Sequence, residues 1–156
     1  MADSFNKEDF IKQQVRMVDI PHMRALGAEI IDFARGEVTV RLPYSDHLVG
    51  NPETGVLAGG AISALLDNVC GSSVVAYEMK DAAFATLDLR IDYMKPATPG
   101  RDVLAFAECY KMTSRIAFVR GIAYHDSKDD PIANAAATFM FTGGKRIHKV
   151  TEEIKP

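Results

Sequence analysis

Residues 59–77 constrain this chain most, because they are apolar on nearly every side and contain a single charge. Their apolar side chains do not gather on one stripe, as they would in a helix lying on a protein surface. We therefore expect a helix, begun at a pair of glycines, that the rest of the chain wraps. The one charge is Asp67. An ionised carboxylate in a buried helix is costly unless it is paired, hydrogen-bonded or used in chemistry.

The length of 156 residues fits one ordinary domain. We expect a single domain over 1–156, with an N-terminal helical extension at 5–26, a core at 27–143 and a short polar tail at 144–156. The hydrophobic content of 47% with 25% charged residues is typical of globular proteins. The net charge of -3 and the lack of a basic stripe argue against nucleic-acid binding.

The start of the chain is polar and acidic and lacks the pattern of a signal peptide. No uninterrupted apolar stretch reaches the roughly 18 to 20 residues that a membrane span needs, so we expect a cytoplasmic protein without membrane contact. Cys70 and Cys109 fit buried reduced thiols better than a disulfide or a metal site. The sequence has no CxxC or HExxH spacing and its histidines are scattered, so no metal is expected.

The remaining helices and strands are indicated by changes in the spacing of apolar residues along the sequence. Short helices are expected at 6–17 and 21–26, with Gly27 ending the second, and a loop is expected at 43–54. Six strand patterns surround the long helix, and the apolar side chains of the first strand after it are Leu87, Leu89, Ile91 and Tyr93. The six strands are 30–33, 38–42, 87–93, 103–111, 116–124 and 132–141.

This order of elements predicts an α+β fold in which one antiparallel sheet curls around one long helix. The sheet has more strands than one amphipathic helix face could cover, and the helix is apolar all round, so curling buries both. An exposed edge strand is expected to remain. Such an edge can pair with the same edge of a second copy, which makes a dimer or tetramer plausible.

The segment from Asn51 through Gly60, followed seven residues later by Asp67, resembles the hot-dog-fold acyl-CoA thioesterases, specifically the phenylacetate-degradation (PaaI-like) group. That family's pattern runs roughly N-x-x-G-x-L-H-G-G-x6-D. The resemblance covers about residues 25–143 and continues in 87–97, where relatives have a strand ending in a Y-x-x-P-A turn. It implies the hot-dog fold, with the sheet wrapped around the helix. It also implies hydrolysis of an acyl-CoA or aryl-acyl-CoA thioester to the free acid and coenzyme A.

The resemblance further implies two catalytic residues. The backbone N–H of Gly59 would polarise the thioester carbonyl, and the unpaired donors and positive dipole end of a helix N-terminus suit that task. Asp67 would act either as a nucleophile on the thioester carbon or as a base for a water. The two residues are eight apart on one helix, or roughly 12 Å. In the family's arrangement, Gly59 therefore works with Asp67 of the neighbouring subunit, at a dimer interface.

Two further catalytic candidates follow from the resemblance. The family's asparagine, which helps to hold the water or the carboxylate, falls on Asn51, although this loop is one residue longer than the pattern. A hydroxyl residue early in the strand after the helix matches Thr86, where it could hydrogen-bond the acid or the water. In a regular strand the side chain of Thr86 lies on the same face as Asp88, opposite to Leu87. It therefore reaches the site only if a bulge or the end of the strand redirects it.

Four residues are assigned to substrate binding. Gly60 is the second glycine of the pair, and Ala58 stands where the family usually has histidine. His47 is either a stand-in for that histidine or an ordinary loop residue. Lys95 could meet the phosphates of coenzyme A, or it could be a solvated charge on the strand.

Other interpretations remain open at this point. Asp67 could be a structural carboxylate that is hydrogen-bonded to Ser63 or Asn68. The chain could be a hot-dog protein that binds an acyl-CoA without cleaving it, which Ala58 would permit. A hydratase of the same fold is less favoured, because the loop before the helix has no paired Asp/His signature. No cofactor is expected, since coenzyme A is part of the substrate, and the partners expected are acyl-CoA and further copies of the chain.

Overall fold

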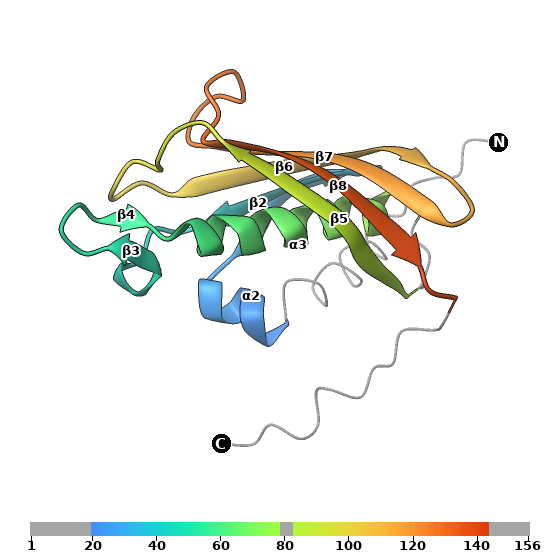
Figure 1. Ribbon diagram of the computed structural model, residues 1–156, viewed down its shortest axis with the longest axis horizontal. Helices are drawn as coiled ribbons and strands as arrows, with labels where there is room; N and C mark the ends of the chain where they lie inside the picture. The colour runs from blue at the N-terminus through green and yellow to red at the C-terminus, as the bar shows by residue number, and fades with distance from the viewer. Residues whose placement is uncertain (1–19, 79–82, 144–156) are drawn as a thin grey trace.

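The computed structural model describes residues 20–78 and 83–143 (Figure 1). The expected helix at 6–17 and the tail at 144–156 lie outside these residues. The elements are α2 Pro21–Leu26, β1 Glu29–Ala34, β2 Glu37–Leu42, η1 Asp46–Leu48, β3 Val49–Asn51, β4 Val56–Leu57, α3 Gly59–Glu78, β5 Phe84–Tyr93, β6 Val103–Met112, β7 Ile116–Tyr124 and β8 Ala133–Phe141.

Six strands form one sheet in the order β1-β2-β6-β7-β8-β5, and every pair of neighbours is antiparallel. Figure 1 shows α3 lying along the inner side of this sheet, which curls over it. The strands β1 and β5 are the two edges. The predicted architecture, one curled antiparallel sheet around one long helix, is therefore the observed one.

The core lies between α3 and the sheet. Leu65, Leu66, Val69 and Cys70 on the helix are fully buried, and each large apolar side chain removed from water contributes about 1.5–3 kcal/mol. The helix and the sheet approach closely at Gly121 of β7, where an added Cβ would lie 2.9 Å from the Cys70 sulfur. Burial, with a smaller contribution from the charge of Asp67, raises the pKa of the Cys70 thiol to about 12.

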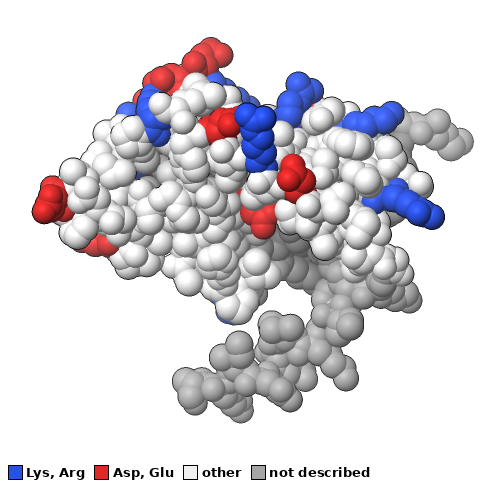
Figure 2. All heavy atoms as spheres, viewed as in Figure 1, with Lys and Arg blue, Asp and Glu red and all other residues white. Residues whose placement is uncertain are grey.

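The helix α3 is long and apolar enough to cross a membrane by length and composition alone. However, 67% of that stretch is buried inside the fold, as in the core helix of a soluble protein. Figure 2 shows acidic and basic side chains interspersed on one face of the molecule, with an uncharged surface over the first turns of α3. The apolar character of α3 is accounted for by the sheet that covers it.

The short helix α2 follows the expected signals. Pro21 occupies its start, and Gly27 ends it with a φ of 72°, donating its backbone N–H to the carbonyls of Arg24 and Met23. Met23 and Leu26 are buried against the core.

Two local features differ from expectation. The loop expected at 43–54 contains η1 and β3, and β3 pairs with β4 in a small hairpin that is too short to produce an alternating pattern. In addition, the assignment of Leu87 and Tyr93 to a buried strand face was wrong, since they are 55% and 47% exposed. The register of β5 against β8 shifts between Thr86 and Asp88, which makes Leu87 the extra residue of a bulge at the sheet edge.

Candidate active site

The start of α3 is held in place by the small β3–β4 hairpin that precedes it. The Ala58 N–H donates to the Leu48 carbonyl at 2.8 Å, and the Ala58 carbonyl accepts from the Ala61 N–H at 3.0 Å. Gly59 and Gly60 then begin the helix, and both are exposed. The first N–H groups of a helix have no partner within it and lie at its positive end. The helix therefore presents backbone donors at an accessible surface.

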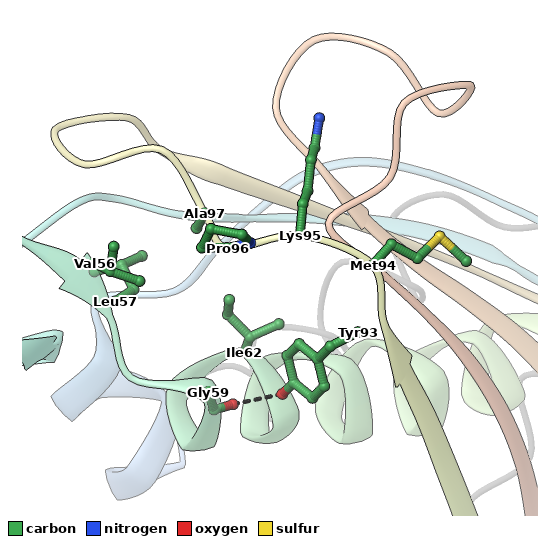
Figure 3. Close-up of a pocket in the computed structure, with 9 residues that line it drawn as sticks. All are labelled: Val56, Leu57, Gly59, Ile62, Tyr93, Met94, Lys95, Pro96 and Ala97. Atoms are coloured by element: carbon green, nitrogen blue, oxygen red, sulfur yellow. Dashed lines mark hydrogen bonds between the residues drawn. The ribbon is translucent and has the colours of Figure 1, made fainter.

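A cavity of about 300 Å³ lies beside these donors (Figure 3). Its wall is mostly apolar, and its size is at the lower end for small-molecule sites. Two elements build it, the turn into α3 and the end of β5 with the loop that follows. It is lined by Val56, Leu57, Gly59, Ile62, Tyr93, Met94, Lys95, Pro96 and Ala97.

Asp67, the one charged residue between Gly59 and Tyr77, lies two turns further along α3 and has a hydroxyl partner. Thr86 Oγ1 donates to Asp67 Oδ1 at 3.0 Å. In a regular strand, Thr86 would have the orientation of Asp88, and only a bulge or a strand end could turn its side chain to the site. The register shift between Thr86 and Asp88 is such a bulge. Asp67 is half-buried, while the hydroxyl of Ser63 pairs with Tyr93 rather than with this carboxylate. A carboxylate held in this way can act as a base or as a nucleophile.

Asn51 is the last residue of β3, directly before the turn into β4, and is exposed. Its Oδ1 accepts the Glu53 N–H at 3.0 Å, and its carbonyl accepts the Gly55 N–H at 2.8 Å. These contacts are those of a turn residue. Within the described chain, no hydrogen bond joins Asn51 to Asp67, so its catalytic role stays a prediction.

The predicted substrate-binding residues His47, Ala58 and Lys95 make different contacts within the chain. His47 Nε2 lies 2.9 Å from the Ala25 carbonyl and its Nδ1 lies 2.6 Å from Ser45 Oγ, so its ring ties the loop to α2. Ala58 lies so close to Gly50 of β3 that a Cβ added to Gly50 would be 2.8 Å from the Ala58 Cα. Lys95 lines the cavity and is ion-paired with Asp130. Contacts of these residues with a substrate stay predictions.

Sequence reasoning missed Tyr93 as a site residue. Its hydroxyl donates to the Gly59 carbonyl at 2.7 Å, and its ring lines the cavity (Figure 3). The signal that could have found it is its place at the head of the Y-x-x-P-A turn, directly before the loop that closes the cavity. Among residues 20–78 and 83–143, no cluster of three or more metal-ligating side chains occurs.

Two candidate catalytic groups thus lie along one helix: backbone donors at its start, and a carboxylate bound by a hydroxyl two turns further on. Residues 54–132, which contain both, match the sequence profile of the thioesterase superfamily. The chain belongs to the thioesterase superfamily. The activity class of this thioesterase is the hydrolysis of a thioester, a reaction that needs donors for a developing oxyanion and a group that delivers the attack.

Known proteins resemble this thioesterase along most of its length. The medium/long-chain acyl-CoA thioesterase YigI of Escherichia coli is 28% identical in an alignment 134 residues long that covers 78% of this chain and 85% of YigI. A crystal structure of a Pseudomonas aeruginosa protein has a TM-score of 0.77 at 43% identity, covering 84% of this chain and 98% of that one. The Escherichia coli PaaI protein from the phenylacetic acid degradation operon has a TM-score of 0.78 at 16% identity, covering 91% of this chain and 99% of PaaI. The last likeness is one of fold, and it confirms the predicted hot-dog architecture.

The hydrogen bond between Thr86 and Asp67 gives a testable prediction for this thioesterase. Replacing Thr86 with valine keeps the shape of the side chain but removes the donor, and we expect kcat to fall about tenfold because the carboxylate loses its orientation. Thr86→Ser keeps the hydroxyl and should stay within about threefold of the wild type. The measurement is free-thiol release at saturating substrate. Equal rates for the valine and serine variants would show that the hydroxyl does not serve catalysis.

Proposed function

We propose that this thioesterase hydrolyses acyl-CoA thioesters at a site that two subunits share. The observation that carries the proposal is the separation of its two half-sites. Gly59 begins α3, and Asp67, with its partner Thr86, lies eight residues along the same helix, or roughly 12 Å away. One thioester carbonyl cannot meet both in a single chain, so a second copy has to supply one of them.

The proposed chemistry uses each half-site for one task. The carbonyl oxygen of the thioester accepts the N–H of Gly59, which stabilises the negative charge that develops on attack. Asp67 of the partner subunit either takes a proton from a water that attacks the carbonyl carbon, or attacks that carbon itself to form an anhydride that water then hydrolyses. In both routes the bond from carbon to sulfur breaks, coenzyme A leaves as the thiol, and the free acid remains.

The edge strand β5 offers a way to bring the half-sites together. It pairs with β8 on one side, and within the described residues no strand pairs with its other side. Two β5 edges could pair antiparallel with Leu89 of each copy opposite Arg90 of the other. Thr86 of one copy would then lie opposite Tyr93 of the other, since Thr86 is three residues before Leu89 and Tyr93 is three residues after Arg90. The hydroxyl-bound carboxylate of one subunit would then lie near the helix start of its partner.

The acyl group would enter the cavity beside Gly59. The apolar lining and the volume of about 300 Å³ suit a hydrocarbon chain better than a polar group. The similarity to YigI, a medium/long-chain acyl-CoA thioesterase, supports a straight acyl chain over an aromatic one. Free-thiol release from a panel of straight-chain and aryl acyl-CoAs tests this choice, and a preference for aryl substrates would contradict it.

Subunit complementation tests the shared site. We expect Asp67→Asn and Gly59→Pro to be inactive separately, because each removes one half of every site. Co-expressed with different affinity tags, they should form heterodimers in which one of the two sites combines an intact Gly59 with an intact Asp67. Random assembly would give about a quarter of the wild-type activity, and purified heterodimers about half.

The outcome that contradicts the shared site is equally clear. If each site lay within one subunit, every site of the heterodimer would carry one defect, and purified heterodimers would be as inactive as their parents. Light scattering at micromolar concentration gives an independent check. A fully active monomer would rule out the shared site while leaving thioester hydrolysis intact.

A further inference from the structure

The hydroxyl of Tyr93 lies between two groups near the start of α3. It is 2.7 Å from the Gly59 carbonyl oxygen and 2.8 Å from Ser63 Oγ. A carbonyl oxygen can only accept, so the phenol must donate its proton to Gly59. The Ser63 hydroxyl must then donate to the phenol oxygen. The result is a directed chain from Ser63 through Tyr93 to Gly59, in which each bond polarises the next.

This chain of hydrogen bonds acts on the least constrained part of the helix. Gly59 and Gly60 are consecutive glycines at the helix start, and glycine has the greatest backbone freedom of all residues and a low helix propensity. The Gly59 carbonyl belongs to the same planar peptide unit as the Gly60 N–H. Anchoring the carbonyl on β5 therefore fixes the direction of that N–H, while the bond from the Ala61 N–H to the Ala58 carbonyl fixes the peptide that carries the Gly59 N–H.

We propose that Tyr93 is a positioning residue for the oxyanion donor of this thioesterase, the Gly59 N–H. By holding the Gly59 carbonyl it fixes the peptide that follows Gly59, and together with the bond between Ala61 and Ala58 it keeps the first turn of α3 in its reactive geometry. This rests on the proposed function of the same site. Donors that are already aligned before the reaction stabilise a transition state without further reorganisation. Two glycines alone would not supply that alignment, and the phenol compensates for their freedom.

The test compares Tyr93→Phe with a matched control. Phenylalanine keeps the ring in the cavity wall and removes only the hydroxyl, so we expect an unchanged melting temperature and a kcat lower by about five- to tenfold. KM should stay within about twofold, because the oxyanion develops only in the transition state. Tyr110→Phe is the control, since Tyr110 is also 47% exposed but stacks on Arg120 away from the cavity. That variant should match the wild type.

A second variant separates positioning from simple packing. Gly60→Ala stiffens the first turn, and apart from the adjacent residues and the helix backbone its Cβ would meet no atom within 4 Å. If Tyr93 acts by holding a flexible turn, the phenol should matter less once the turn is stiffer. The double variant Gly60→Ala/Tyr93→Phe should therefore have a kcat only about twofold below that of Gly60→Ala alone. An undiminished loss would overturn the proposal, as would a raised KM with kcat unchanged.

The proposal and the function on which it rests fail in different ways. If the wild type releases no thiol from any acyl-CoA, the proposed function is wrong. If the wild type is active and Tyr93→Phe is equally active, only the role of Tyr93 is wrong.

Discussion

Replacing Asp67 with asparagine should lower kcat by about 10²–10⁴-fold while leaving the protein folded. The amide can neither accept a proton at neutral pH nor attack the thioester, so both routes of the mechanism are blocked. Its oxygen can still accept the hydrogen bond from Thr86 that the carboxylate accepts now. Free-thiol release from a saturating acyl-CoA measures the activity, and a thermal melt checks the fold.

The matched control for this change is Asp129→Asn. Asp129 is an exposed carboxylate in the loop between β7 and β8, where its N–H binds Ser127 Oγ. Its replacement also removes one negative charge, so an effect of net charge alone would appear in both variants. If Asp67→Asn kept more than about a tenth of the wild-type activity, Asp67 would not deliver the attack, although hydrolysis itself would stand.

Gly59→Pro should lower kcat by about 10²–10³-fold, the loss that follows removal of one oxyanion donor. Proline has no backbone N–H, yet the first position of a helix tolerates it well, because that N–H has no partner within the helix and the ring suits the helical φ. The substitution therefore removes the donor and spares the helix. Steady-state kinetics should show the loss in kcat, with a smaller change in KM.

Gly59→Ala is the comparison that isolates the N–H. An added Cβ would lie 3.7 Å from the Tyr93 hydroxyl oxygen, an ordinary van der Waals distance, so alanine fits. Because alanine keeps the N–H, we expect activity within about threefold of the wild type. Equal losses for alanine and proline would assign the effect to crowding at the helix start, and the donor role would then be wrong.

The elements that could be predicted from the sequence are those whose apolar residues repeat with a clear period. The helix α3, the strands β6 to β8 and the first hairpin are such elements, and each was predicted within a few residues. The hairpin of β3 and β4 escaped because two or three residues per strand cannot show an alternation. The position of Leu87 was missed because a bulge depends on pairing with β8, which local sequence does not specify.

The features of the candidate site also fall into those that the sequence could reveal and those that it could not. Gly59 and Asp67 could be found because a glycine pair and a lone charge are conspicuous in an apolar segment, and the family resemblance gave them roles. The link from Tyr93 to Gly59 joins residues 34 positions apart, and the sequence alone does not reveal that they meet. The contacts of His47 with Ala25 and of Lys95 with Asp130 also depend on the packing of loops.

The close packing of Gly121 against Cys70 has a consequence for an enzyme whose product is a thiol. Each turnover of the proposed reaction would release coenzyme A as a thiol beside the protein, and a separate oxidant would have to convert that thiol to a disulfide before it could exchange with a cysteine. The attacking species in thiol–disulfide exchange is the thiolate, and a thiol with a pKa of about 12 forms almost none at neutral pH. Cys70 is also fully buried. The folded protein therefore keeps this sulfur from forming mixed disulfides with oxidised coenzyme A, even though it lies one helical turn from the proposed catalytic carboxylate.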